Sequence, residues 1–174
     1  SDNEGGAFKA TDFLIRIGHR RIGHIMGPDS MPVSHIRLEG YKFALKKNKI
    51  PFDSQLVKSV DLTRKSTFQV MDRFMKMKSR PTAFFAFKNY TGLDAIEYLK
   101  KKYPSKLKSI DFVGFGNLPL FQYLYHKPIA SIEESSYEMG EEAARLLFKI
   151  MKDKETPHLR IVQHIQLHCK LQVH

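Results

Sequence analysis

Arg37 is the residue whose type and position most directly suggest binding chemistry. It follows Ser34, which can cap the helix that comes next. This would place Arg37 in the first helical turn, where a cation opposes the helix dipole at a cost of about 0.3–1 kcal/mol. A ligand carboxylate, phosphate or pair of hydroxyls would offset that cost through the forked guanidinium donors. A salt bridge to Glu39 or Asp29 would offset it too, and position alone does not separate these two interpretations.

Three apolar segments end in polar or glycine-containing residues. Met26 leads into 27–30, Phe87 leads into Lys88, and Phe115 leads into 116–119. In an open parallel sheet, ligands bind beyond the carboxyl ends of the strands, so these segments are predicted to form the rim of a site. Lys88 raises the same choice as Arg37, between a ligand contact and a solvated loop lysine.

Catalytic, metal and cofactor chemistry is not predicted. No Ser, His and Asp set has a readable local spacing, and the only cysteine, Cys169, falls on the apolar face of a predicted strand. The glycines at 114 and 116 lack the third glycine and the acid of a dinucleotide fingerprint, and they predict a tight turn instead. His164 and His168 lie four residues apart in a strand, about 13 Å, so they cannot share one metal. We therefore expect no catalytic residue, no metal and no cofactor.

The composition suits one compact α/β domain or two small lobes. The 174 residues are 42% hydrophobic and 27% charged, and one cysteine permits no internal disulfide, which favours a reducing compartment. No apolar run reaches the ~20 residues of a membrane helix. The sequence therefore predicts no membrane partner.

The net charge of +11 invites a nucleic-acid interpretation. The densest basic stretch, 100–108, closes a predicted helix, where the helix dipole favours lysines. The sequence shows no zinc-finger spacing, basic zipper or obvious helix-turn-helix. Any specific DNA contact is therefore expected from another segment.

Helical and strand patterns alternate along the chain, which predicts βαβ units and a parallel sheet with right-handed crossovers. The predicted helices cover 3–17, 34–47, 63–78, 91–103 and 135–151. Gly18 is predicted to stop the first, and a capping box at Ser135 opens the last. The predicted strands cover 22–26, 55–60 (an edge strand), 83–87, 110–115, 129–132 and 165–173. Strict alternation in the last of these predicts one wet face.

Several short motifs stand in a fixed order: DNEGGA (2–7), GHRRI (18–22), GP (27–28), RLEGY (37–41), RPTA (80–83), VGF (113–115) and MG (139–140). Each is weak by itself. Together, over essentially the whole chain, they resemble the effector-binding part of LacI/GalR-type transcriptional regulators, which are related to periplasmic sugar-binding proteins.

The resemblance implies a Rossmann-like, parallel-sheet α/β fold of the periplasmic-binding-protein type. Residues 19–131 would form a complete C-terminal effector-binding lobe, and 154–174 its terminal strand or strands. Residues 1–18 and 132–153 would be helices of a partial N-terminal lobe, with the rest of that lobe and a DNA-binding headpiece upstream. Both helices are then expected to expose apolar faces that need the missing sheet or a neighbour.

The resemblance also implies a set of site residues. Arg37 matches the arginine that commonly grips the effector, and Asp2 matches an acidic residue that often contacts it. Leu62 stands where an aromatic side chain often stacks on the ligand, and Glu134 takes another lining position.

Two polar pairs of the family pattern are altered here. The usual Asn-Asp after the fourth apolar strand is Lys88-Asn89, and the usual Asp-Asp after the Val-Gly-Phe motif is Gly116-Asn117. Because Lys88 adds a cation, we expect a sugar-like effector that carries an anionic group held by Arg37 and Lys88.

On this resemblance the chain is the sensor domain of a cytoplasmic, dimeric transcriptional regulator that is not an enzyme. It would touch DNA only through the headpiece, and effector binding would close the lobes and shift a two-state population. The alternative is a solute-binding receptor of a sugar transporter, but the motifs at 18–22 and 37–41 favour the regulator. An enzyme on a flavodoxin-like fold would need an acid/base pair, for which only Asp29 and Lys88 are candidates.

Overall fold

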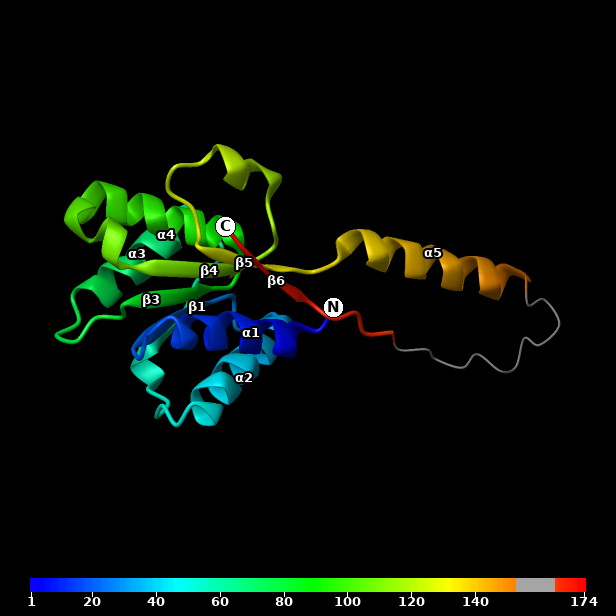
Figure 1. The fold of residues 1–174 in the computed structure, drawn as a ribbon, viewed down its shortest axis with the longest axis horizontal. Coiled ribbons are helices and arrows are strands. Elements are labelled where there is room, and N and C mark those ends of the chain that lie inside the picture. The colour runs from blue at the N-terminus through cyan, green and yellow to red at the C-terminus, as the bar shows by residue number, and fades with distance from the viewer. Residues whose placement is uncertain (153–164) are drawn as a thin grey trace.

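The computed structural model describes residues 1–152 and 165–174, which form a six-stranded sheet with helices on both faces (Figure 1). The strand order is β2-β1-β3-β4-β5-β6. Strands β1 to β5 pair in parallel, with Phe85 of β3 beside Val113 of β4, and β6 pairs antiparallel with β5. The predicted parallel α/β sheet is confirmed, with one antiparallel strand added at its edge. The strands are β1 (Ile22–Met26), β2 (Val57–Ser59), β3 (Ala83–Ala86), β4 (Asp111–Phe115), β5 (Ala130–Glu133) and β6 (Lys170–Val173).

Four helices cover the two faces of the sheet, and a fifth extends away from it (Figure 1). Helices α1 and α2 lie on one face, and α3 and α4 on the other. None of the helices in the described residues is long and apolar enough to cross a membrane. The helices are α1 (Asn3–Arg16), α2 (Pro32–Lys47), α3 (Arg64–Met75), α4 (Asn89–Lys102) and α5 (Ser136–Lys152), with short 3₁₀ turns at Ser54–Leu56, Pro104–Ser109 and Pro119–Tyr123.

The side chains of β3 show that both faces of the sheet are buried under helices. Alternate side chains of a strand point to opposite faces. Phe85 therefore packs under α1 and α2, while Phe84 packs against Phe74 of α3 and Phe112 of β4 at ring distances of 5.2 and 5.3 Å. This confirms the buried strand predicted from the continuous apolar run.

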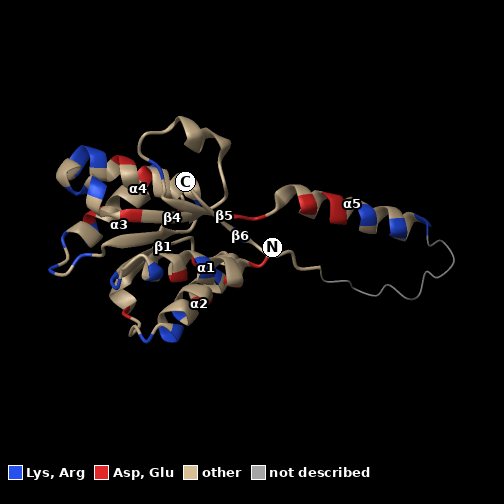
Figure 2. Cartoon of the chain, in the orientation of Figure 1, with Lys and Arg blue, Asp and Glu red and all other residues tan. Residues whose placement is uncertain are grey.

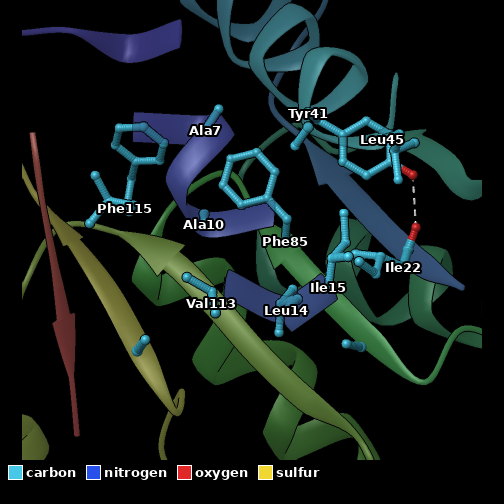
Figure 3. Close-up of a cluster of buried hydrophobic side chains, with 14 of the residues drawn as sticks. Ala7, Ala10, Leu14, Ile15, Ile22, Tyr41, Leu45, Phe85, Val113 and Phe115 are labelled. Atoms are coloured by element: carbon cyan, nitrogen blue, oxygen red, sulfur yellow. Dashed lines mark hydrogen bonds between the residues drawn. The ribbon is translucent and has the colours of Figure 1, made fainter. Parts of the chain in front are cut away.

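Helix α1 is an integral part of this fold. Ala7, Ala10 and Leu14 are fully buried against the sheet, and Figure 3 shows them facing Phe85 and Val113. The expectation that the helix at 3–17 leaves an apolar face uncovered is therefore wrong. Its small residues let it lie flat on the sheet beside α2.

The close approach of α1 and α2 depends on Gly40. A Cβ at this position would collide with the backbone carbonyl of Glu4 and crowd Ala7. Further along α2, the Tyr41 hydroxyl donates a hydrogen bond of 2.8 Å to the carbonyl of Ile22, drawn as the dashed line in Figure 3. These contacts fix α2 against both α1 and β1.

Helix α5, unlike α1, is not packed against the sheet. None of its side chains is buried, and Leu147, Phe148, Ile150 and Met151 are each more than half exposed. Figure 1 shows it extending away from the sheet. The expectation of an uncovered apolar face is confirmed for this helix.

Several helix starts differ from the prediction. Helix α2 begins at Pro32 with Met31 as N-cap, so Ser34 lies inside the helix and is not its cap. Proline is preorganised for the first helical position, which explains the earlier start. Arg37 consequently lies in the second turn, beyond the region where the dipole penalty acts. Helix α4 begins at Asn89, two residues before Thr91.

The capping box predicted at the start of α5 does not take its usual form. Helix α5 begins at Ser136, and Ser135 has a φ of 52°, whereas an N-cap residue is normally extended. By contrast, Thr63 accepts from the amide of Ser66 and caps α3 where a helix start was predicted. Gly18, with a φ of 109°, ends α1 as predicted.

The two edges of the sheet are shorter than predicted. Strand β2 covers Val57–Ser59 at one edge, after a 3₁₀ turn, and β6 covers Lys170–Val173 at the other. Residues 165–169 are not in a strand, and His164 lies outside the described residues. Cys169 is buried as expected, but Val173 is 55% exposed, so the predicted apolar face is only partly covered.

Candidate ligand-binding site

Arg37 links three distant segments at the carboxyl edge of the sheet. Its side chain is buried, and its Nε donates to Oδ1 of Asn3 at 2.9 Å. One terminal nitrogen donates to the backbone carbonyl of Phe87 at 2.6 Å, and the other to Oε1 of Glu134, 97 residues away, at 3.2 Å. The salt bridge to Glu39 or Asp29, one of the two alternatives left open from position, does not form, and Arg37 pairs with Glu134 instead.

Two aromatic rings flank the Arg37 guanidinium. Its Cζ lies 3.5 Å from the ring centroid of Phe115 and 4.8 Å from that of Phe87. Burial lowers the pKa of Arg37 to about 10, while the charge of Glu134 acts to raise it. The guanidinium stays charged at neutral pH, held by cation–π contacts and an ion pair.

The guanidinium keeps hydrogen-bonding capacity in reserve. Arginine has five N–H donors, and three carry the bonds just described, so each terminal nitrogen has one N–H left within the described residues. Glu134 receives Arg37 and the Ser1 hydroxyl on Oε1, which leaves its Oε2 as an acceptor. This edge can therefore offer a ligand two donors and an acceptor.

Lys88 lies near the cluster formed by Arg37 and its flanking rings. It precedes α4, is exposed, and has its Nζ 5.9 Å from the ring centroid of Phe87, the ring that also faces Arg37. Within the described residues it forms no ion pair. The structure thus brings Lys88 to the same ring as Arg37, with its charge uncompensated.

Asn89 and Gly116 have internal roles. Asn89 is buried, and its Nδ2 donates to Oγ of Ser131 at 3.2 Å. A Cβ on Gly114 would strike the Asn89 amide, so that glycine gives the amide its space. Gly116 has a φ of 87° and donates to the carbonyl of Ile132 at 2.9 Å, which confirms the predicted tight turn. Asn117 is exposed on the segment that follows.

Asp2 and Leu62 complete the predicted set. Asp2 caps α1 by accepting from the amide of Gly5 at 2.8 Å, and its other oxygen lies 3.5 Å from Nδ1 of His168. Leu62 has a φ of 68° and packs with the core under α3 and α4. Asp2 therefore lies next to the Arg37 group through Asn3, whereas Leu62 packs in the opposite layer.

Sequence reasoning missed Asn3, Phe87 and Phe115 as partners of Arg37. The available signal was that two apolar strands end on phenylalanine and that Asn3 follows the cap of α1. It also missed that the Ser34 hydroxyl is buried without a hydrogen-bond partner in the described residues, close to Gly27 at the end of β1.

His24 is fully buried in the core and is not part of the candidate ligand site. It stacks on Phe85 at 4.5 Å and on Tyr41 at 5.4 Å, and its Nδ1 lies 3.0 Å from the carbonyl of Phe85. Burial lowers its pKa to about 4, so it is neutral at physiological pH. Within the described residues, no group of three or more His, Cys, Asp or Glu side chains could hold a metal ion.

Residues 11–169 match the periplasmic binding protein-like domain family. The chain belongs to this family. The HTH-type transcriptional repressor CytR of Escherichia coli (strain K12) is 34% identical to it over 151 residues, which cover 87% of this chain and 44% of that protein. The chain spans about half the length of the curated relatives it matches.

Solved structures of LacI-type regulators share the fold. A putative regulator LacI from Bacillus cereus subsp. cytotoxis NVH 391-98 superposes with a TM-score of 0.85 at 27% identity, over 99% of this chain and 60% of that one. The transcriptional regulator CelR in complex with cellobiose gives 0.82 at 29% identity, over 99% and 51%. The resemblance to the LacI/GalR family and its periplasmic-binding-protein-like fold is confirmed.

Proposed function

We propose that this chain is the ligand-sensing domain of a DNA-binding transcriptional regulator and that it binds a small sugar-like effector at Arg37. The observation that carries the proposal is the buried guanidinium with two N–H groups in reserve beside a carboxylate oxygen. A pair of neighbouring hydroxyls could accept from the guanidinium while donating to Glu134. The cellobiose complex of CelR supports a sugar as the ligand class.

Arg37 and Lys88 would have different roles. The charge of Arg37 is balanced by Glu134, so Arg37 suits neutral hydroxyls as well as anions. Lys88 has no such partner in the described residues and is the group that an anionic substituent would meet. An effector held by both would be a sugar acid or a sugar phosphate.

The signal would leave the site through Glu134. This residue lies two positions before α5, so a ligand that competes for Arg37 changes the contacts at the base of that helix. Residues 132–153 would then belong to a second lobe built from upstream segments, and effector binding would shift the population of two lobe arrangements. DNA would be contacted through an upstream headpiece, in the cytoplasm.

A transcriptional regulator is favoured over a solute-binding receptor and over an enzyme. The curated relatives are named transcriptional repressors, which supports a regulator rather than a transporter receptor or an enzyme. The carboxyl edge holds an ion pair and a lysine rather than an acid/base pair placed for proton transfer.

A homodimer would use the surface between α4 and residues 117–128. Tyr90, Tyr123 and Tyr125 are 63%, 81% and 87% exposed, and a hollow of about 410 Å³ there is lined by Leu93 and Leu120. Exposed aromatic residues are typical of interfaces. Sedimentation should show a dimer that Tyr125→Asp dissociates and that Tyr137→Asp, at an equally exposed tyrosine on α5, leaves intact. A monomer in both the parent chain and the control removes this assignment.

The effector is tested by thermal shift on this chain and on a version extended upstream. The probes are cellobiose, glucuronate and glucose 6-phosphate at millimolar concentration. A ligand at 100 times its dissociation constant should add about 2.7 kcal/mol of stability. Arg37→Lys, which keeps the charge but loses the fork, should abolish the shift for every ligand.

Lys88→Ala separates neutral from anionic effectors. It should remove the shift by glucuronate or glucose 6-phosphate and spare a shift by cellobiose, whereas Lys65→Ala, at an exposed lysine of α3, should change neither. A folded protein in which no probe shifts, or a ligand that Arg37→Lys still binds, would contradict the proposed site.

A further inference from the structure

We propose that the edge of the sheet opposite the ligand site binds the phosphate backbone of duplex DNA without reading its sequence. We call this surface the amino edge and define it as residues 16–21, 46–53, 73–80 and 100–111. The choice of DNA as the polyanion rests on the proposed function. The choice of this surface as the binding site rests on the distribution of charged residues in the structure.

The topology gathers the basic residues at this edge. Because the strands are parallel and joined by helices, α1 to α4 all end where the strands begin. Figure 2 shows Lys and Arg gathered at that end of the molecule, with a smaller group on α5. In the four ranges of the amino edge only Asp53 and Asp111 are acidic, and both are engaged, with Arg21 and His19 respectively.

The carboxyl edge is less basic, because acidic residues stand there beside Arg37 and Lys88. Around the candidate ligand site stand Asp2, Glu4, Asp29, Glu133 and Glu134. The net charge of +11 is therefore not spread over the surface but concentrated at one end. Such segregation produces a field that attracts a polyanion to the amino edge.

Helix dipoles account for only part of this concentration. They favour lysines in the last turns of α2 and α4. They do not account for five exposed cations outside the α-helices, none of which forms an ion pair within the described residues: Lys49, Lys78, Arg80, Lys106 and Lys108. Lys49 even occupies a φ of 56°, where glycine or asparagine is the less costly residue.

Three cations of the amino edge stand around one hollow. The hollow of about 530 Å³ lies between the start of β1 and the loop after α2; its lining is mostly apolar, and Arg20, Arg21, Lys49 and Asp53 contribute to it. Phe52 in the same loop is 45% exposed. Backbone phosphates lying against this part of the amino edge would be close to Arg20 and Lys49, while Arg21 is paired with Asp53.

The dimensions also suit a duplex. Five parallel strands at about 4.8 Å spacing, with a helix layer about 10 Å away on each face, give an edge of roughly 20 by 20–30 Å. A duplex carries one charge per about 1.7 Å of axis with both strands counted, so about a dozen phosphates lie along 20 Å of duplex and a part of them faces the protein.

The test measures binding of this 174-residue chain to a labelled duplex of random sequence by fluorescence anisotropy, over a series of salt concentrations. We expect a dissociation constant in the range of about 10⁻⁴–10⁻⁶ M and an affinity that falls steeply with salt. Two unrelated duplex sequences should bind equally.

A matched pair of variants separates position from total charge. Lys49→Glu/Lys78→Glu/Lys106→Glu, at the amino edge, should weaken binding by at least about tenfold and flatten the salt dependence. Lys65→Glu/Lys149→Glu/Lys152→Glu changes the net charge equally but lies elsewhere and should bind nearly as the parent. All six lysines are exposed, and circular dichroism checks the fold of both variants.

Equal loss in the two variants would overturn the proposal, because only total charge would matter. Absence of salt-dependent binding would overturn it too, as would tight binding to vesicles of anionic lipid with no duplex binding. The sugar thermal shifts are read separately at the opposite edge, so failure of the ligand site and failure of the amino edge are distinguishable.

Discussion

Helices α1 and α5 have similar sequence patterns and opposite environments. Each has apolar residues at helical spacing, and each was expected to leave an apolar face uncovered. In the structure Ala7, Ala10 and Leu14 of α1 are fully buried, whereas α5 has no buried side chain. An amphipathic pattern therefore indicates that a helix needs a partner, but connectivity decides which one. Helix α1 runs through a short turn into β1, so it packs on the same sheet.

The first prediction makes the same substitution in both helices and has the largest expected effect. Leu14→Ala removes a fully buried side chain and should reduce the free energy of unfolding by about 2–5 kcal/mol. Leu147→Ala acts on a side chain that is 57% exposed and should change it by less than about 0.5 kcal/mol. Urea denaturation measures both. Similar losses in the two variants would mean that α5 is covered in solution.

The second prediction concerns acid sensitivity of the layer that contains α1. The pKa of His24 is about 4 in the folded chain and near its ordinary 6.5 when unfolded, so the unfolded state binds the proton first. Stability from this group is complete above about pH 6.5 and falls by roughly 3 kcal/mol as the pH drops towards 4. His24→Phe should remove that part of the pH dependence in denaturation series at pH 7 and pH 4.5. If the pH dependence of stability is the same in His24→Phe, protonation of His24 is not the cause of the loss of stability at low pH.

The third prediction replaces one glycine next to α1 and one within α5 by alanine, and expects opposite changes in the free energy of unfolding. Gly40→Ala would force a methyl group into the backbone of α1 and should destabilise the chain by about 1–3 kcal/mol. At Gly140 in α5 a Cβ meets nothing within 4 Å, so Gly140→Ala should stabilise the helix by up to about 1 kcal/mol. Thermal unfolding distinguishes the two signs. Destabilisation by Gly140→Ala would mean that α5 has a close neighbour in solution.

Local patterns predicted most of the elements but not their partners. The apolar run at 83–87, the helix start near Thr63 and the Gly18 stop depend on neighbours in sequence, and all three were predicted correctly. The start of α2 was not, because Ser34 looks like a cap while Pro32 is better suited to begin the helix.

The ligand site shows the same limit. Arg37, the centre of the candidate site, was singled out from position and family resemblance, and its role in binding stays a prediction. Its ion-pair partner could not be chosen, because Glu39 and Asp29 are near in sequence while Glu134 is 97 residues away. Leu62 matched a family position, yet its side chain packs in the layer under α3 and α4. Which side chains meet depends on sheet order, and periodicity carries no information on that order.

Strand β6 has a consequence for how the chain is made. It lies at 170–173 and pairs antiparallel with β5 at 130–133, about forty residues earlier. A ribosome adds residues at roughly 5–20 per second, so β5 waits several seconds for its neighbour during synthesis. Through that interval β5 is an open strand edge, the kind of surface that pairs with other chains. The nascent protein is therefore most prone to aggregate in the interval before residues 170–173 have been added, and slowing elongation over 134–170 should lower its soluble yield.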